Sequence, residues 1–141
     1  MKARAGDIFE IPINEQKALC KVIWVSEEYI DCFGFVVFSK LNDIKQPKEY
    51  KDIKPISLYS GNVKMLYRDV RNLNTSIWPI VENTSVTEEE KELTLHNIAG
   101  KLYRGDDFIK KLTSDEINRY PKFLSAGNQA IINMLQNAFG V

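Results

Sequence analysis

Residues 6–13, Gly6-Asp7-Ile8-Phe9-Glu10-Ile11-Pro12-Ile13, organise this chain. Isoleucine and phenylalanine alternate with acidic residues behind a glycine, which is the period-two pattern of a half-buried β-strand. Pro12 lacks a backbone donor, so we expect the end of this strand to lie at a sheet edge or to leave the sheet. The polar segment 14–17 has the length of a hairpin connection and precedes an apolar run at 18–25. The chain therefore opens with a predicted β-hairpin.

The composition is that of one ordinary globular domain. Of the 141 residues, 44% are hydrophobic and 27% are charged, which argues against a disordered or fibrous chain. Nineteen basic residues balance nineteen acidic ones, so no overall field attracts the chain to nucleic acid or to an anionic membrane. No apolar run has the length of a membrane span, and the first residues lack the hydrophobic region of a signal peptide. We therefore expect a single cytoplasmic domain over residues 1–141, without membrane contact.

Further elements follow from the same patterns. Residues 30–38 are nearly all apolar, which predicts a central strand buried on both faces, with Gly34 allowing a bulge or a close backbone approach. Residues 39–54 are polar and predict a surface loop. Residues 62–70 fit both a helical and a strand period, and we predict a short helix there. Residues 77–81 form an edge or bulged strand because Pro79 interrupts them, and residues 93–98 could extend the sheet.

The last element is the clearest helix in the sequence. Ser125 can cap it, apolar residues repeat at helical spacing from Ala130 to Ala138, and Gly140 provides a stop signal. Its apolar stripe should pack on the sheet. The sequence thus predicts an α+β domain with a curved, mostly antiparallel N-terminal sheet and a packed C-terminal helix, and it leaves closure into a barrel open.

Side chains with catalytic or metal-binding chemistry are scarce. His96 is the only histidine, and a catalytic role would need a nucleophile and an orienting group that the sequence does not identify. Cys20 and Cys32 both lie in apolar runs, which favours buried free thiols over a cross-strand disulfide. One histidine and two separated cysteines also lack the ligand spacing of a zinc site. We therefore predict a protein that is not an enzyme and that holds no metal and no cofactor.

Two basic clusters with aromatic neighbours leave nucleic-acid binding open as an alternative. Such clusters can contact phosphates and stack on bases, but the balanced net charge weakens this interpretation, and a solvated surface is the default. The first cluster, at 64–71, contains Lys64, Tyr67, Arg68 and Arg71, and the second, at 101–111, contains Lys101, Tyr103, Arg104, Lys110 and Lys111.

The opening segment Ala5-Gly6-Asp7-Ile8-Phe9-Glu10-Ile11-Pro12 resembles the start of the immunity protein 26 family, in which Gly-Asp-Ile-Phe-x-Ile-Pro leads into a β-hairpin. Gly34-Phe35 within an aromatic strand and the segment Ile77-Trp78-Pro79-Ile80-Val81 also look like later strands of that family. The chain departs from the family at Glu82-Asn83, where the family usually has Gly-Asn. The resemblance covers roughly residues 1–85.

This resemblance implies a cytoplasmic bacterial immunity protein that binds and neutralises a cognate toxin domain of a polymorphic toxin system, often a nuclease. The toxin's active site or substrate channel would be covered by surface complementarity, and the family offers no catalytic residues. Candidate contacts come instead from the chemistry of this chain. They are Glu88, Glu89, Glu90 and Glu92 for charge, and Tyr29, Tyr50 and Tyr59 as exposed aromatic anchors.

Overall fold

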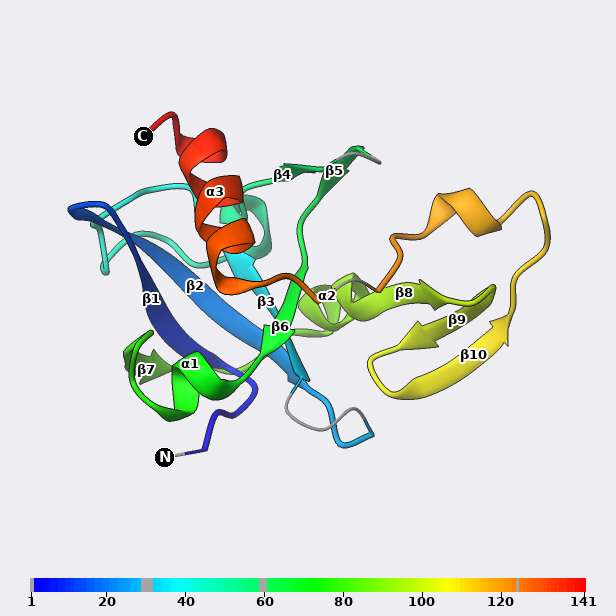
Figure 1. The fold of residues 1–141 in the computed structure, drawn as a ribbon. Helices are drawn as coiled ribbons and strands as arrows, with labels where there is room; N and C mark the ends of the chain where they lie inside the picture. The colour runs from blue at the N-terminus through cyan, green and yellow to red at the C-terminus, as the bar shows by residue number, and fades with distance from the viewer. Residues whose placement is uncertain (1, 29–31, 59–60, 124) are drawn as a thin grey trace.

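The computed structural model describes residues 2–28, 32–58, 61–123 and 125–141. Within these residues the strands form sheets of five, three and two strands, and every pairing between neighbouring strands is antiparallel (Figure 1). The five-stranded sheet has the order β6-β3-β2-β1-β7. Its members are β1 (Asp7–Ile13), β2 (Gln16–Val25), β3 (Cys32–Val37), β6 (Leu66–Asp69) and β7 (Ile80–Asn83). The predicted α+β fold is confirmed, whereas the sheets are not closed into a barrel.

The predicted opening hairpin is formed by β1 and β2. Its turn is shorter than expected, because Ile13 already pairs with Gln16 and only two residues connect the strands. Asn14 takes the left-handed conformation with φ 54°, which asparagine tolerates better than most residues. Pro12 pairs with Lys17 on one side, while β7 pairs with β1 only from Asp7 to Phe9. The missing donor of Pro12 therefore lies where β1 has no neighbour on its other side, as predicted.

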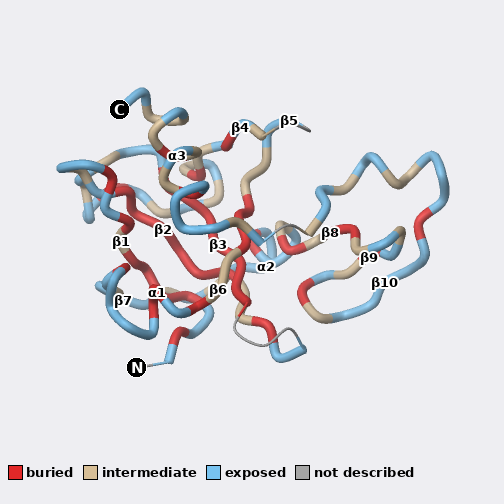
Figure 2. Tube along the Cα trace, in the orientation of Figure 1, coloured by how far each residue is buried: buried red, intermediate tan, exposed pale blue. Residues whose placement is uncertain are grey.

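Alternate side chains of the five-stranded sheet fill two separate cores. Figure 2 shows that the buried residues concentrate along β1, β2 and β3. On one face, Phe9 packs against Phe33, Phe35 and Trp78, with ring centroids 5.5–5.9 Å apart. The C-terminal helix α3 (Asn128–Phe139) covers this face and buries Ile131 and Leu135. Gly127 rather than Ser125 precedes the helix, and Gly140 ends it at φ 68°. No helix in the described ranges is both long and apolar enough to cross a membrane.

The other face of the sheet carries Ile8, Leu19, Ile23 and Val36. The partly buried side chains of Tyr50, Val86 and Leu93 pack over them. The covering segments contain the short helices α2 (Glu88–Lys91), η1 (Tyr50–Asp52) and η2 (Glu92–Thr94). Both faces of β3 are consequently buried, as its uninterrupted apolar sequence predicted.

The helix predicted over residues 62–70 is wrong. The segment instead forms β5 (Gly61–Val63), which pairs with β4 (Ile56–Leu58), and then β6, which pairs with β3; the four-residue helix α1 (Arg71–Asn74) follows. Gly34 lies opposite Tyr67, and a Cβ atom on Gly34 would be 3.1 Å from Tyr67 Cε1 and 2.9 Å from Met65 Sδ. The side chains of Met65 and Tyr67 occupy the space that a side chain at Gly34 would fill, and this packing favours a strand. The local sequence pattern of residues 62–70 carries no information about this contact.

The second sheet has the order β10-β9-β8, with β8 (Leu95–Ile98), β9 (Lys101–Arg104) and β10 (Asp107–Lys111). Residues 93–98 therefore do not extend the first sheet, contrary to expectation. The segment 121–126, which follows the short helix η3 (Ile117–Arg119), links the two sheets. Phe123 N–H donates to Asn97 O of β8 at 3.1 Å, and Ala126 N–H donates to Tyr67 O of β6 at 3.1 Å. One connecting segment thus covers an edge of each sheet.

Candidate functional site

The acidic run predicted to contact a partner forms the helix α2 and the turn after it. Thr87 caps this helix, because its hydroxyl accepts a hydrogen bond from Glu90 N–H at 3.1 Å and its own N–H donates to Glu90 Oε1 at 2.9 Å. Glu88, Glu89 and Glu92 are exposed, and we call these three residues the acidic turn. Two of them form surface ion pairs: Glu88 with Lys91 and Glu92 with Arg104, each at 3.0 Å.

Glu90 does not belong to the exposed acidic surface that the sequence predicted. Its side chain is only 2% exposed, and Oε1 lies 3.0 Å from Nζ of Lys21, whose side chain is 3% exposed. Lys21 also donates a hydrogen bond to Ser85 O at 2.7 Å. Glu90 therefore anchors α2 to the central strand β2, and the expectation that it contacts a partner is corrected.

The three tyrosines predicted as anchors are not confirmed as exposed residues. Tyr29 and Tyr59 lie outside the described residues. Tyr50 is half-buried against the second core, and Nζ of Lys64 lies 4.2 Å from the centroid of its ring. A cation–π contact of this kind occupies the ring face that a partner would otherwise use.

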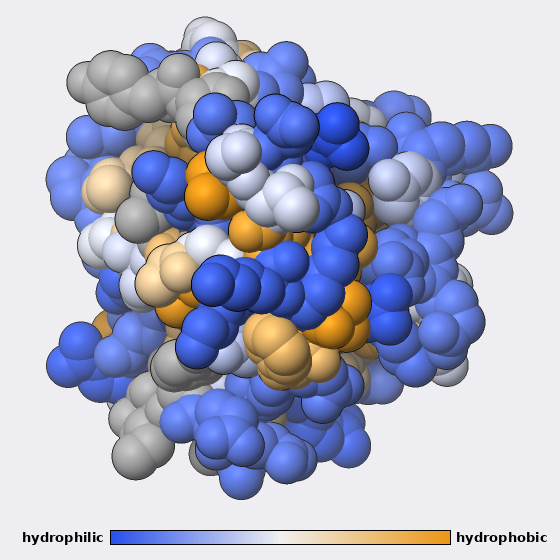
Figure 3. All heavy atoms as spheres, turned by 90° about the vertical axis from the view of Figure 1, so that its right-hand side faces the viewer, coloured by the Kyte–Doolittle hydropathy of each residue, from blue (hydrophilic) through white to orange (hydrophobic). Residues whose placement is uncertain are grey.

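Exposed apolar side chains are found instead on β10. Phe108 is 57% exposed and Ile109 is 41% exposed, although both are large hydrophobic residues. The β9–β10 hairpin lies next to the acidic turn, because Arg104 of β9 contacts Glu92. We call Phe108, Ile109 and the acidic turn together the hairpin face. Figure 3 views the molecule from the side that carries this hairpin and shows hydrophobic atoms within a mostly hydrophilic surface.

The sequence contained a signal for this face that the prediction missed. Phe108 and Ile109 are two adjacent large apolar residues in a charged stretch, so burying both would require apolar cover. The charged residues Asp107, Lys110 and Lys111 directly flank them and offer no such cover. A short edge strand with two adjacent apolar residues therefore indicates exposed hydrophobic surface.

The first basic cluster, at 64–71, is largely occupied by contacts within the protein. Arg68 Nη1 donates to Ala126 O at 3.0 Å, and its guanidinium carbon lies 5.4 Å from the ring centroid of Trp78. Arg71 forms an ion pair with Asp69 at 3.0 Å, and hydrogen bonds from Arg71 help to hold the pKa of Asp69 below its usual range against the opposing effect of desolvation. Tyr67 is buried, so its ring is not available for stacking on a base.

The second basic cluster, at 101–111, is also partly neutralised. Arg104 pairs with Glu92, and Lys110 pairs with Glu116. The hydrogen bond from Lys110, followed by that from the backbone N–H of Thr113, lowers the pKa of Glu116 to about 2. The ring of Tyr103 lies between His96 and Phe108, with centroid distances of 6.0 and 5.7 Å.

His96 is a core residue of the second sheet. It is completely buried, and its Nδ1–H donates to the carbonyl oxygen of Thr94 at 2.7 Å. Its ring packs among Tyr67, Tyr103 and Phe123. Desolvation by burial lowers its pKa, and the hydrogen bond to Thr94 opposes this effect. In the described part of the chain, the hydrogen-bond partner of His96 is thus a backbone carbonyl.

The two cysteines are free and buried, as the sequence predicted. Burial raises the pKa of the Cys20 thiol well above its usual value. Burial, and secondarily the negative charges of Asp106 and Asp69, raises the pKa of Cys32 to about 11. Both side chains consequently remain protonated at neutral pH and behave as small hydrophobic groups.

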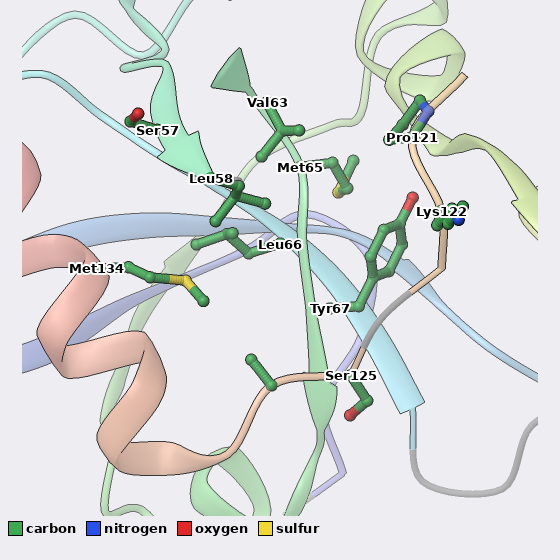
Figure 4. Close-up of a pocket in the computed structure, with 11 residues that line it drawn as sticks. Ser57, Leu58, Val63, Met65, Leu66, Tyr67, Pro121, Lys122, Ser125 and Met134 are labelled. Carbon is green, nitrogen blue, oxygen red and sulfur yellow. The ribbon is translucent and has the colours of Figure 1, made fainter. Parts of the chain in front are cut away.

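A separate groove of about 490 Å³ lies between β4, β5, β6, the segment 121–126 and helix α3 (Figure 4). Its walls are mostly apolar. The polar side chains that line it are those of Ser57, Tyr67, Lys122 and Ser125. We call this space the apolar groove. Its apolar lining comes from Leu58, Val63, Met65, Leu66, Pro121, Ala126 and Met134.

No three His, Cys, Asp or Glu side chains come together as metal ligands in the described residues. The site therefore consists of a hairpin face and an apolar groove, neither of which contains clustered ligands for a metal. Comparison of the chain with protein-family models, with curated proteins and with solved structures found no match.

Proposed function

We propose that this protein is an immunity protein that binds a cognate bacterial toxin domain, a nuclease, and blocks its active site or substrate channel. The observation that carries the proposal is the hairpin face: the β9–β10 hairpin exposes the apolar residues Phe108 and Ile109, and its Arg104 forms an ion pair with Glu92 of the acidic turn. Exposed apolar residues with a charged surround are characteristic of protein-binding surfaces. The resemblance of residues 5–12 to the immunity protein 26 family points to the same class of function.

In the proposed mechanism, charged residues speed association and apolar residues slow dissociation. Nucleases bind phosphates with basic side chains, so Glu88, Glu89 and Glu92 would attract the same surface that attracts the substrate. Opposite charges accelerate association, and this effect is weakened by salt. Phe108 and Ile109 would then be buried in the interface with the toxin, and this burial slows dissociation.

The buried pair of Lys21 and Glu90 supports this role indirectly. It fixes α2 on the central strand β2, so the exposed glutamates are held on an element whose backbone position is set by the core. A preorganised surface loses less conformational entropy on binding. Ion pairs within the protein engage both basic clusters and two residues of the acidic turn, so we favour a protein partner over nucleic acid because of the exposed apolar residues Phe108 and Ile109.

The proposal is tested by co-expression with the toxin domain encoded immediately upstream. We expect the protein to restore growth and to purify in a stable complex with that domain. The double variant Phe108→Ala with Ile109→Ala should raise the Kd at least about tenfold through faster dissociation. Ile77→Ala is the matched control, because Ile77 is 59% exposed but lies outside the hairpin face.

A second arm isolates the contribution of charge. Replacing Glu88, Glu89 and Glu92 with glutamine should slow association and reduce its salt dependence, while the same change at the exposed acidic residues Glu15, Glu28 and Asp115 should not. Absence of both rescue and complex would overturn the proposal. Binding to DNA or RNA with a steep loss of affinity in salt would support the nucleic-acid alternative instead.

A further inference from the structure

The apolar groove has features of a small-molecule site that the hairpin face does not share. Its volume of about 490 Å³ falls within the range of ligand pockets, and its walls are dominated by aliphatic side chains with few polar groups. Met65 and Met134 both line it. Methionine side chains adapt to apolar ligands of different shapes because they are unbranched and polarisable.

Tyr67 supplies an independent indication of where the polar group of a ligand would bind. The residue is 4% exposed and lines the groove, and its hydroxyl has no hydrogen-bond partner among the described residues. Figure 4 shows this hydroxyl pointing toward the end of the groove formed by Met65, Pro121 and Lys122. A buried hydroxyl without a partner is costly, so an acceptor placed there would be stabilised. Burial raises the pKa of Tyr67, which keeps the hydroxyl protonated as a donor at neutral pH.

The charge near the same end of the groove selects the ligand chemistry. Lys122 is exposed and lines the groove, whereas no acidic side chain is among the described residues that line it. A cation next to an unpartnered hydroxyl donor favours an anionic acceptor over a neutral or a cationic head group. The rest of the lining requires an aliphatic body.

We propose that the apolar groove binds a small amphiphilic carboxylate of the medium-chain fatty acid type. The carboxylate accepts a hydrogen bond from Tyr67 and lies near Lys122, while the aliphatic chain contacts Leu58, Leu66 and Met134. This site is distinct from the hairpin face and does not depend on a toxin partner.

The test is calorimetric titration of the purified protein with decanoate, decan-1-ol and decyltrimethylammonium. We expect decanoate to bind with a Kd below about 1 mM and decyltrimethylammonium to bind at least about tenfold more weakly. Tyr67→Phe removes only the hydroxyl and should weaken decanoate about tenfold, as for a hydrogen bond to a charged group. Lys122→Gln should weaken it about threefold. Lys122→Gln should not alter the affinity for decan-1-ol, whose head group is uncharged, and Tyr67→Phe should weaken decan-1-ol less than decanoate.

Lys51→Gln is the control for the lysine change, because Lys51 is exposed and does not line the groove. Met134→Trp should fill the groove and abolish binding of decanoate, and circular dichroism will establish that the variant is folded. The results for Tyr67→Phe and Lys122→Gln can be interpreted even if Met134→Trp does not fold. Absence of decanoate binding overturns the proposal, and so does equal binding of all three amphiphiles, since the second result would indicate unspecific apolar contact.

Discussion

Lys21 and Glu90 form a nearly fully buried ion pair between β2 and the helix α2. The two residues are 69 positions apart, so an acidic sequence run gave no indication that one of its members points inward. Desolvation of two charges is expensive and is compensated only when their partners remain in place. The carboxylate of Glu90 also accepts the hydrogen bond from Thr87 N–H that closes the capping box. One residue thus connects helix initiation to the core.

Glu90→Gln should therefore destabilise the protein strongly. The amide would leave the ammonium of Lys21 buried without a counter-charge, and we expect a loss of about 3–5 kcal/mol in the free energy of unfolding. Urea unfolding followed by circular dichroism measures this change. Glu89→Gln on the exposed side of the same helix is the control and should stay within about 0.5 kcal/mol of the unchanged protein. Equal, small effects of both substitutions would contradict the assignment of Glu90 as an anchor.

Titration of His96 should make the free energy of unfolding depend on pH just below pH 6.5. Its folded pKa is lowered from the usual 6.5 by burial, so the unfolded chain binds more protons just below that pH. Stability should therefore be complete above pH 6.5 and should decrease as the pH falls toward the folded pKa, by at most about 1.4 kcal/mol per pH unit. Because His96 is the only histidine, His96→Phe should remove this slope.

Urea unfolding at intervals between pH 7.5 and 5.5 checks this prediction. The carboxyl groups of Glu116 and Asp69 do not obscure the window, because their folded pKa values lie below the usual ones. For Glu116 the folded pKa is about 2, below its usual 4.5, so its contribution is lost only when the pH falls below the latter value. A slope that persists in His96→Phe would show that another group titrates there.

At the scale of elements, Gly34 determines how β3 and β6 fit together. A side chain at this position would meet Met65 Sδ at 2.9 Å and Tyr67 Cε1 at 3.1 Å. Gly34→Ala should therefore push β6 away and destabilise the protein by about 1–3 kcal/mol, as overpacking does. Gly127→Ser is the control, because no atom lies within 4 Å of the added Cβ and serine suits a helix N-cap. Thermal unfolding of the two variants distinguishes them, and equal midpoints would contradict this packing argument.

The elements that could be predicted from sequence are those with a single clear period. Strands β1, β2 and β3 have strong apolar patterns, and helix α3 combines a stripe with a glycine stop, so local signals and tertiary packing agree. Residues 62–70 satisfied two periods at once, and the contact of Tyr67 with Gly34 selected the strand. The same limit applies to the site: the exposure of Glu88, Glu89 and Glu92 followed from composition, whereas the burial of Glu90 depended on a distant lysine.

At the scale of the whole molecule, the two larger sheets meet through aromatic side chains. Trp24 and Tyr67 come from the five-stranded sheet, and His96 comes from the three-stranded sheet. Phe123 of the linking segment contacts all three, with its ring centroid 4.7 Å from that of Tyr67 and 5.1 Å from that of His96. The hairpin face is carried by the second sheet, so this cluster also determines how firmly the proposed binding surface is held.

Phe123→Ala should uncouple the second sheet from the first. Its loss removes the contacts on both sides of the cluster, while the Phe9–Trp78 core on the other face of the first sheet is unchanged. We expect the amides of β8, β9 and β10 to exchange with deuterium at least about tenfold faster, and those of β1 and β2 to change little. Phe108→Ala, which truncates an exposed ring on the β9–β10 hairpin, should leave all these exchange rates nearly unchanged. Uniform acceleration in both sheets would mean that the molecule opens as a single cooperative unit, and the hairpin face would then be as rigid as the core on which it rests.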